Sequence, residues 1–355
     1  MANTAEIGEF IRNITVMHAT HETVIDVAVD NGYQRNKTCF WSQDHQGKLI
    51  IREFSLASQG QVGIANASAS GESIGVYEVN GAPWTVGDCI DTPVVFSSQD
   101  YATSDLNTAL VNHSLMTAGM GGRNINLVTS LPLDHYFSKG KPNHEFINSV
   151  KFAFQAPTKC LSGENLAKVQ KHFIFPESVA AWIDYSLDAQ GNERVKNTNG
   201  VAVVDIGGNT TDITYIYENN QINRKRSGTE LIGVRNVLHD LGEILREQFS
   251  LTNTPSLRRL EQSLATNLCN ISGTAKNIVD HIENAKALTA KRLHLFIREK
   301  LGDADDLDYV IFVGGGAVVL DGIQAPYINA VVPERPEFAN ARGMLKYLTY
   351  IEDNK

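Results

Sequence analysis

The sequence lacks the features of a membrane-spanning chain, a secreted chain or a protein that coats nucleic acid directly. No stretch approaches about 18 uninterrupted apolar residues, so we expect no segment to span a bilayer. The start of the chain holds Glu6 and Glu9 but no basic region followed by a long apolar run, so we expect no secretory signal. Acidic residues outnumber Lys and Arg by 40 to 31, and the formal net charge is −9. This charge disfavours nonspecific binding to phosphate backbones or anionic lipid, although an acidic protein can reach DNA through an adaptor.

Cysteine is scarce and scattered. Four cysteines occur among 355 residues without forming a C-x-x-C pair: Cys39, Cys89, Cys160 and Cys269. This distribution is typical of reduced thiols and not of a disulfide framework, so we expect a cytoplasmic protein. The segment from His18 to Glu22 resembles a metal-binding cluster, but no partner ligands stand at a suitable spacing, and we expect no metal there.

Two common nucleotide-binding motifs are also missing. The sequence contains no G-x-x-x-x-G-K-[ST], which argues against a P-loop enzyme. The glycines of residues 119–122 resemble a dinucleotide fingerprint, but they follow a helical pattern and precede a strand, the reverse of the required order. We interpret them as the end of a helix. With 42% hydrophobic and 20% charged residues, the chain is typical of a globular protein that is long enough for two domains.

What the sequence does contain is an alternation of strand and helix patterns. Apolar runs predict strands at 23–29, 125–130, 171–175, 201–206, 212–217 and 309–313, with further strands and hairpins in 35–58 and 74–96. Apolar residues at helical spacing predict helices at 104–117, 177–187, 231–250, 274–300 and 336–350. Asn80-Gly81 predicts a tight hairpin turn. Each half of the chain begins with an apolar strand followed by an Asp-containing turn, which indicates duplicated α/β domains.

These patterns predict the domain borders. We expect an N-terminal extension at 1–22 with a short helix at 6–14. A first domain follows at 23–190, onto which the helix at 336–350 packs back, and a second domain occupies 191–335. The polar run at 188–200 is the predicted linker between the two domains.

Three of the predicted strands end in turns that suit a phosphate. Backbone N–H groups in such turns attract anions without any side-chain charge, and glycine allows a phosphate to approach the backbone closely. The turns are Asp30, Asn31 and Gly32; Gly207, Gly208, Asn209, Thr210 and Thr211; and Gly314, Gly315 and Gly316. Each alone is equally typical of an ordinary hairpin turn, but three in this order favour a nucleotide site.

Three carboxylates accompany these turns. Asp205, at a strand end, would repel phosphates unless a cation lies between, and this predicts Mg²⁺ with Asp30 on the opposite side of the same hydrated ion. Glu177 follows Pro176 at a predicted helix start and has two interpretations. It either stabilises the helix dipole from the first turn, or it acts as a general base that orients water for attack on a γ-phosphate.

The order of these motifs resembles the superfamily of actin, sugar kinases and 70-kDa heat-shock chaperones. The order is an Asp-turn, Pro-Glu-Ser, Asp-x-Gly-Gly-x-Thr-Thr-Asp, Gly-Gly-Gly and a final Ala-Asn-Ala-Arg-Gly-Met at 339–344. Within the superfamily the motif sequences are most similar to those of ParM/StbA, the bacterial actins of plasmid partition, and Thr-Ser-Leu-Pro-Leu at 129–133 supports this. The resemblance covers about residues 24–347. It implies two actin-like (ribonuclease H-like) α/β domains with a nucleotide cleft between them.

The resemblance also implies a function and partners. The family binds ATP or ADP with Mg²⁺ in the cleft, hydrolyses ATP, and forms dynamic filaments that segregate plasmid DNA. Its partners are further copies of itself and a DNA-binding adaptor on a centromere-like plasmid site.

The resemblance assigns a role to each motif. Asp30 to Gly32 match the first phosphate loop, Asp205 to Thr211 match the second, and residues 314–316 match the loop beside the adenosine. Glu177 matches the glutamate implicated in hydrolysis. The stretch from Gly228 to Gly233 lies where the family closes over the nucleotide, with Glu230 as a ribose contact. The sequence departs from the family pattern at Tyr33 and Gln34, where a hydroxyl residue is usual, and in its first 22 residues.

Three rival functions belong to the same superfamily. A small-molecule kinase needs a base beside a substrate pocket, and no dedicated substrate domain is visible. A chaperone ATPase needs a peptide-binding module after its nucleotide domain, and the stretch after Gly316 is expected to be too short for one. A non-polymerising ATP-dependent scaffold stays open, because polymer contacts have no short motif.

Overall fold

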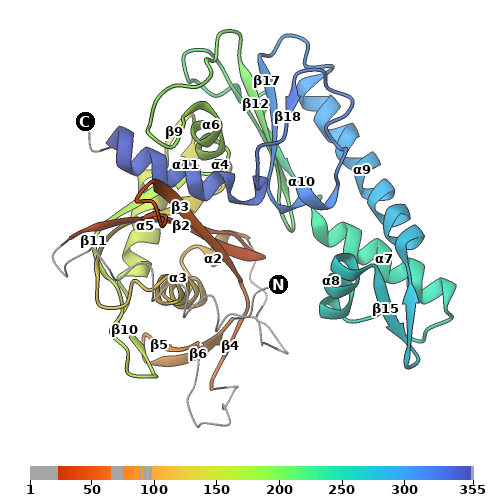
Figure 1. The fold of residues 1–355 in the computed structure, drawn as a ribbon, viewed down its shortest axis with the longest axis horizontal. Helices are drawn as coiled ribbons and strands as arrows, with labels where there is room; N and C mark the ends of the chain where they lie inside the picture. Colours follow the sequence, from red (N-terminus) through yellow and green to blue (C-terminus); the bar gives the residue numbers. More distant parts are fainter. Residues whose placement is uncertain (1–22, 65–74, 88–89, 91–93, 95–97, 353–355) are drawn as a thin grey trace. The chain divides into compact units, whose positions relative to one another are not determined.

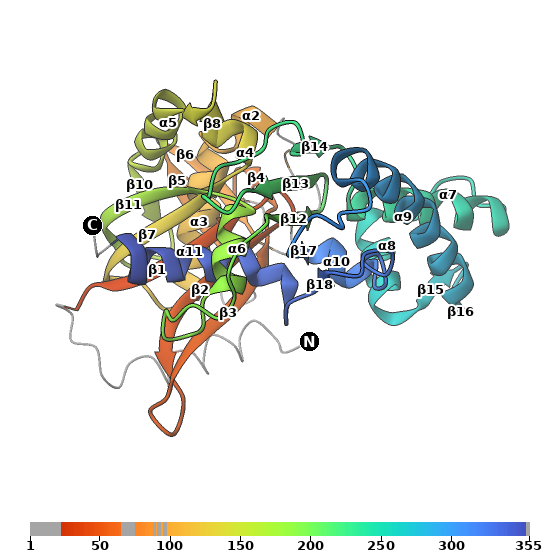
Figure 2. The same cartoon turned by 90° about the horizontal axis from the view of Figure 1, so that it is seen from above.

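The computed structural model describes residues 23–64, 75–87, 90, 94 and 98–352, shown as a ribbon in Figures 1 and 2. The chain divides into two compact units. Unit 1 holds the residues up to Lys196 together with those from Phe338 onward, and unit 2 is Asn197–Glu337. The predicted helix at 6–14 and the His18–Glu22 segment lie outside the described residues.

Unit 1 is built on a five-stranded sheet in the order β11-β7-β1-β2-β3. The strands are β1 (Ile25–Asn31), β2 (Arg35–Gln43), β3 (Leu49–Ala57), β7 (Asn124–Leu131) and β11 (Lys168–Pro176). β1, β7 and β11 run parallel, whereas β1, β2 and β3 form an antiparallel meander. The carboxyl ends of the three parallel strands therefore meet at one edge of the sheet, the edge at which α/β proteins bind ligands.

Helices cover both faces of this sheet. The helices of unit 1 are α2 (Ser98–Tyr101), α3 (Asp105–Thr117), α4 (Leu133–Tyr136), α5 (His144–Phe154), α6 (Val179–Ser186) and α11 (Ala339–Tyr347), which is followed by a π-helical segment at Leu348–Glu352. Alternate residues of β1 point to opposite faces, so Val27 and Val29 pack with the α3 side while Ala28 packs with the α6 and α11 side. The predicted Ser104 cap is confirmed, because its Oγ accepts the backbone N–H of Asn107 at 3.1 Å.

A second sheet in unit 1 has the order β10-β5-β6-β4. Its strands are β4 (Gly60–Val62), β5 (Val76–Val79), β6 (Ala82–Val86) and β10 (Thr158–Cys160), and a separate small ribbon pairs β8 (Phe137–Ser138) with β9 (Lys141–Pro142). Asn80 and Gly81 join β5 to β6 with φ values of 51° and 80°. Positive φ at both positions is the signature of the tight hairpin turn that Asn-Gly predicts, and the prediction is confirmed.

Unit 2 has a five-stranded sheet in the order β14-β13-β12-β17-β18. The strands are β12 (Val201–Ile206), β13 (Thr211–Ile216), β14 (Gly228–Glu230), β17 (Tyr309–Val313) and β18 (Ala330–Val331). The helices are α7 (Val234–Gln248), α8 (Leu257–Thr266), α9 (Val279–Leu301) and α10 (Gly315–Val319). Every residue of β12 and β13 is buried; β12 is an apolar run interrupted only by Asp205, whereas β13 also buries Thr211, Asp212 and Thr214.

The predicted helix at 274–300 is wrong at its start. Thr274–Asn277 form strand β16, which pairs with β15 (Leu268–Ile271), and α9 begins only at Val279. Gly273, at φ 80°, makes the tight turn that joins the two strands. The local pattern at 274–277 is compatible with a helix, but cross-strand pairing decides the outcome. No helix among the described residues is long and apolar enough to cross a membrane.

A histidine in the unit 1 sheet makes the stability of the protein depend on pH. His172 of β11 has its Nε2 3.0 Å from Thr129 Oγ1, and its Nδ1 is buried without a hydrogen-bond partner. Burial, with a smaller effect from Lys151, lowers the pKa of His172 to about 3. The unfolded chain binds a proton at about pH 6.5 and the folded chain resists it, so stability falls as pH drops from about 6.5 towards 3.

We expect His172→Gln to flatten this dependence, because glutamine can hydrogen-bond Thr129 but does not become charged. The wild-type free energy of unfolding should decrease by up to about 1.4 kcal/mol per pH unit from this residue. Urea unfolding of both proteins at several pH values between 6.5 and 4.5 measures the difference, and His144→Gln on an exposed position is the control. Equal slopes in wild type and His172→Gln would contradict the assignment.

Candidate functional site

In unit 1 the ends of β1, β7 and β11 bring two predicted carboxylates to one serine. Ser130 Oγ lies 3.0 Å from Asp30 Oδ1, 3.0 Å from Glu177 Oε1 and 3.2 Å from Asn31 Oδ1. Asp30 is only 2% exposed. A hydroxyl has a single proton to donate, so Ser130 couples these oxygens to one another. The sequence analysis did not assign Ser130 to the site, although it lies in the Thr-Ser-Leu-Pro-Leu stretch that supported the resemblance.

Asp30 has a positive partner that the sequence analysis missed. Lys37 Nζ lies 2.9 Å from Asp30 Oδ2, and the side chains are 18% and 3% exposed. The two residues are direct cross-strand partners of β1 and β2. Such pairs interact closely, so the lysine offsets the cost of burying the carboxylate. The hairpin register is the signal that could have found Lys37, because the Gly32 turn places it opposite Asp30.

The side chains beside Asp30 are tied into unit 1. Asn31 Oδ1 accepts the backbone N–H of Ser130 at 3.0 Å, and its Nδ2 donates to Asn107 Oδ1 at 3.1 Å. The carbonyl of Gly32 accepts the Ser58 hydroxyl at 2.6 Å. The ring of Tyr33 packs against Tyr101 with centroids 5.1 Å apart. The tyrosine that replaces the usual hydroxyl residue therefore serves the packing of unit 1.

Glu177 stands before its helix and not within it. The predicted helix start at 177 is wrong by two residues, because α6 begins at Val179 and Ser178 has a φ of 62°. The dipole interpretation required Glu177 in the first helical turn, and the structure places it outside that turn. Its backbone N–H donates to the carbonyl of Leu131 at 2.9 Å, which fixes the residue at the end of β7.

In unit 2 the predicted second phosphate loop is the turn between β12 and β13. The start of α7 holds this turn, since Val234 N donates to Gly207 O at 3.1 Å and Arg235 N donates to Gly208 O at 2.8 Å. A Cβ on Gly233 would lie 2.7 Å from both carbonyl oxygens, so only glycine allows this contact. Gly233 and the loop, far apart in sequence, are thereby brought together.

The threonines of this loop have separate environments. Thr210 Oγ1 donates to Asp212 Oδ2 at 3.2 Å. Thr211 is fully buried, and its hydroxyl donates to the carbonyl of Ile232 at 2.7 Å. Thr211 therefore stabilises the loop through this hydrogen bond. Glu230, its cross-strand partner on β14, is exposed. Asn209 lies in the turn itself, between the two strands.

The third glycine turn packs against the end of β12. Gly314 has a φ of 84°, and a Cβ there would lie 2.5 Å from Asp205 Oδ1. A Cβ on Gly316 would overlap the side chain of Ile206, whereas a Cβ on Gly315 would meet nothing within 4 Å. Asp205 is 8% exposed. Gly314 therefore packs directly against the Asp205 carboxylate, and we call this contact, together with the Gly207–Gly208 turn that follows Asp205, the cradle.

A second aspartate faces Asp205 from the neighbouring strand. Asp212 of β13 is the direct cross-strand partner of Asp205 and is also 8% exposed. Asp212 accepts the hydroxyls of Thr229 and Thr210. Two negative charges at directly paired strand positions repel each other unless hydrogen-bond donors or a cation offset the repulsion. In the part of the chain that the structure describes, no group of three His, Cys, Asp or Glu side chains gathers to hold a metal ion.

Comparison with known proteins agrees with this arrangement. Residues 25–188 match the family model of the plasmid segregation protein ParM, N-terminal part. Residues 203–323 match the model of the archaeal actin homologue MreB-like, C-terminal part. A sequence comparison with curated proteins gave no match.

Solved structures share the fold over almost the whole chain. An archaeal actin homologue in complex with ADP has a TM-score of 0.68 at 20% identity, covering 91% of this chain and 98% of that one. ParM of Bacillus thuringiensis with ATP has a TM-score of 0.67 at 16% identity, covering 94% and 100%. ParM in a 15-stranded filament from Clostridium botulinum has a TM-score of 0.64 at 16% identity, covering 92% and 99%.

The α/β architecture and these likenesses define an actin-fold protein. Within that class, the first half of the chain matches the ParM N-terminal family model and the second half matches the C-terminal model of an archaeal actin homologue. The resemblance drawn from the motifs is confirmed.

Proposed function

We propose that this chain is a cytoplasmic ATPase whose ATP-dependent filaments segregate plasmid DNA. The two compact units would be the two actin-like domains, with ATP or ADP and Mg²⁺ bound in the cleft of that fold. The proposal is supported by relatives solved with ATP, with ADP and as a filament. The observation that carries it is the close glycine packing around Asp205. A Cβ on Gly314 would lie 2.5 Å from Asp205 Oδ1, and a Cβ on Gly233 would lie 2.7 Å from the carbonyl oxygens of Gly207 and Gly208.

We place the phosphates of the nucleotide against this cradle and against the turn at Asp30. Turn N–H groups bind phosphate oxygens in this kind of concavity. Gly233 holds the Gly207–Gly208 turn in position through the start of α7. Lys37, beside Asp30, adds a positive charge on the unit 1 side. Gly315, the most open of the three later glycines, is the one we assign to the adenosine.

Mg²⁺, when bound, neutralises phosphate charge as the terminal phosphate leaves. We assign such an ion to the unit 2 side, because Asp205 is a carboxylate just before the Gly207–Gly208 turn and a hydrated Mg²⁺ needs only one or two protein carboxylates. Asp30 is the second candidate, although its two oxygens already face Lys37 and Ser130.

Glu177 is the group we assign to hydrolysis. The Ser130 hydroxyl holds its carboxylate at the strand edge that also carries Asp30. A carboxylate so placed can orient water and accept its proton during attack on the terminal phosphate. Loss of that phosphate removes contacts that favour assembly and thereby shifts the population towards free subunits.

We further propose two kinds of partner. The first is another copy of the chain, because contacts that do not close into a ring produce filaments. The second is a DNA-binding adaptor on a centromere-like plasmid site, since a formal charge of −9 disfavours direct contact with DNA.

Light scattering of the purified full chain tests this function. The protein is mixed with Mg-ATP, Mg-ADP or no nucleotide while phosphate release is followed in parallel. We expect scattering that rises only with Mg-ATP and decays as phosphate appears. Phosphate release without scattering would instead favour a non-polymerising scaffold or a kinase, which a screen of hydroxyl acceptors distinguishes. The absence of both scattering and phosphate release would contradict the proposal.

Asp205→Ala tests the metal assignment. We expect it to weaken ATP binding by roughly tenfold when Mg²⁺ is present and far less in EDTA, because the lost carboxylate acts through the ion. Titration with a fluorescent ATP analogue in both buffers measures the two affinities. Thr211→Val, which removes a hydroxyl bonded to the Ile232 carbonyl, is the control for damage to the loop. An unchanged affinity with Mg²⁺ would show that Asp205 does not hold the ion.

A further inference from the structure

We propose that helix α11 positions Glu177, and that Asn340 is the residue through which it does so. The inference rests on the proposed hydrolytic function of Glu177. It starts from a strained turn directly after that residue, and it assigns a task to a segment that otherwise belongs to the core of unit 1.

The strained turn is centred on Ser178. Ser178 has φ 62° and ψ −45°, and Val179 N donates to Glu177 O at 2.6 Å. This is a three-residue γ-turn of the rare, strained hand, in a residue type that seldom adopts positive φ. Ser178 is completely buried. Such strain persists only where the surroundings enforce it, and it tends to mark functional positions.

Asn340 of α11 is the contact that holds this turn. Its Oδ1 accepts the backbone N–H of Ser178 at 3.0 Å, and Asn340 is 6% exposed. The peptide between Glu177 and Ser178 therefore has both polar groups bonded, its carbonyl to Val179 and its N–H to Asn340. These two bonds set the plane of that peptide and hence the direction in which the Glu177 side chain leaves the backbone.

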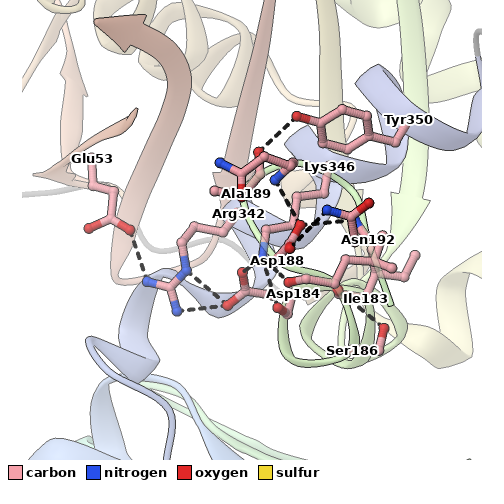
Figure 3. Close-up of polar contacts among 12 residues, drawn as sticks. Glu53, Ile183, Asp184, Ser186, Asp188, Ala189, Asn192, Arg342, Lys346 and Tyr350 are labelled. Atoms are coloured by element: carbon pink, nitrogen blue, oxygen red, sulfur yellow. Dashed lines mark hydrogen bonds and ion pairs between the residues drawn. The ribbon is translucent and has the colours of Figure 1, made fainter. Parts of the chain in front are cut away.

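Helix α11 is itself locked against α6 beyond this contact. A Cβ on Gly343 would overlap the carbonyl oxygen of Ala180, so the two backbones touch there. Further along, Asp184 accepts Arg342 Nε and Lys346 Nζ, both at 2.8 Å, as Figure 3 shows. α6 and α11 lie side by side in Figures 1 and 2. Asn340 thus projects from a helix whose position is fixed.

The identity of the residue supports a positioning role. Asparagine is a poor former of helix interiors, and at a buried position an apolar residue of similar size would serve packing alone. Asn340 Oδ1 accepts the Ser178 N–H, which would otherwise be a buried donor without a hydrogen bond.

A pair of near-isosteric variants tests the inference in the full-length protein. Asn340→Leu removes the acceptor, whereas Asn340→Asp keeps it. With saturating Mg-ATP we expect phosphate release to fall by about tenfold in Asn340→Leu and to stay within about threefold of wild type in Asn340→Asp, because small misplacements of a catalytic group are costly. Nucleotide affinity should change by less than about twofold in either variant, since the ground-state contacts are retained.

A glycine at the strained position provides the second readout. Ser178→Gly tolerates positive φ, so Asn340→Leu/Ser178→Gly should recover at least about half of the lost rate. Tyr350→Phe is the matched control, because it deletes a 2.8 Å bond from the same C-terminal segment to the Ala189 carbonyl (Figure 3) and should leave the rate unchanged.

The outcomes separate this inference from the function on which it rests. The positioning role is overturned if Asn340→Leu releases phosphate as fast as wild type while Glu177→Gln is slow. It is also overturned if Asn340→Leu and Asn340→Asp, or Asn340→Leu and Tyr350→Phe, lose rate equally. A wild-type chain that releases no phosphate, or a Glu177→Gln chain that is as fast as wild type, overturns the proposed function and this inference together.

Discussion

Replacing Glu177 with alanine is expected to slow phosphate release from ATP by about 100-fold while ATP-dependent assembly persists, because a positioned general base contributes roughly that much to a rate. The loss arises in the chemical step alone. We assign phosphate binding to the turns and to Lys37, whereas the Glu177 carboxylate is held by the Ser130 hydroxyl. Filaments should therefore form with Mg-ATP and decay more slowly than those of the wild type. Parallel traces of light scattering and phosphate measure both effects.

Two further variants show whether the carboxylate itself is responsible. Glu177→Gln keeps the shape and the acceptor oxygen for Ser130 but removes the negative charge, and it should be as slow as the alanine variant. Glu145→Ala removes an exposed carboxylate that does lie in the first turn of a helix, α5, and should not affect the rate. Normal phosphate release in Glu177→Ala, or fast release in Glu177→Gln, would refute a role for the carboxylate in hydrolysis.

Gly343→Ala is expected to destabilise unit 1 by about 3 kcal/mol or more, because overpacking against backbone leaves little room for relaxation. In an exposed helix the same change stabilises by about 1 kcal/mol, since alanine is the better helix former. Here the added Cβ would overlap the backbone of Ala180, so the steric cost outweighs the helix propensity. Urea unfolding monitored by tryptophan fluorescence measures the change, with Trp182 of α6 as a reporter near the contact.

A matched glycine in another helix provides the control. Gly315→Ala adds the same methyl group to α10 at a position where it meets nothing within 4 Å, and its effect should stay within about 1 kcal/mol. A stability of Gly343→Ala equal to that of wild type would mean that α6 and α11 separate readily. That result would also weaken the proposed role of Asn340.

Several elements could be predicted almost to the residue. β12 and β17 occupy the predicted 201–206 and 309–313, because both are short apolar runs that end in glycine turns. The Ser104 cap likewise predicted the start of α3, because this local signal agrees with the final structure. The order of the turns led to the actin-like class and to the ParM/StbA resemblance.

Other features depend on contacts between distant segments. Ser130 meets Asp30 across 100 positions of sequence, and Asn340 meets Ser178 across 162. Such pairs are set by strand register and by helix crossing, which no short window contains. The same holds for residues 274–277, where pairing with β15 overrides a helical pattern.

The sequence by itself therefore determined the central strands β1, β7, β12 and β17 and which turns carry the glycines and carboxylates, because these depend on neighbouring residues. Only the tertiary structure decided which side chains support them. It places Lys37 opposite Asp30, puts Ser130 between Asp30 and Glu177, and moves Glu177 out of the helix into a strained turn. The physical reason is that burial and long-range hydrogen bonds select one arrangement among many that local propensity allows.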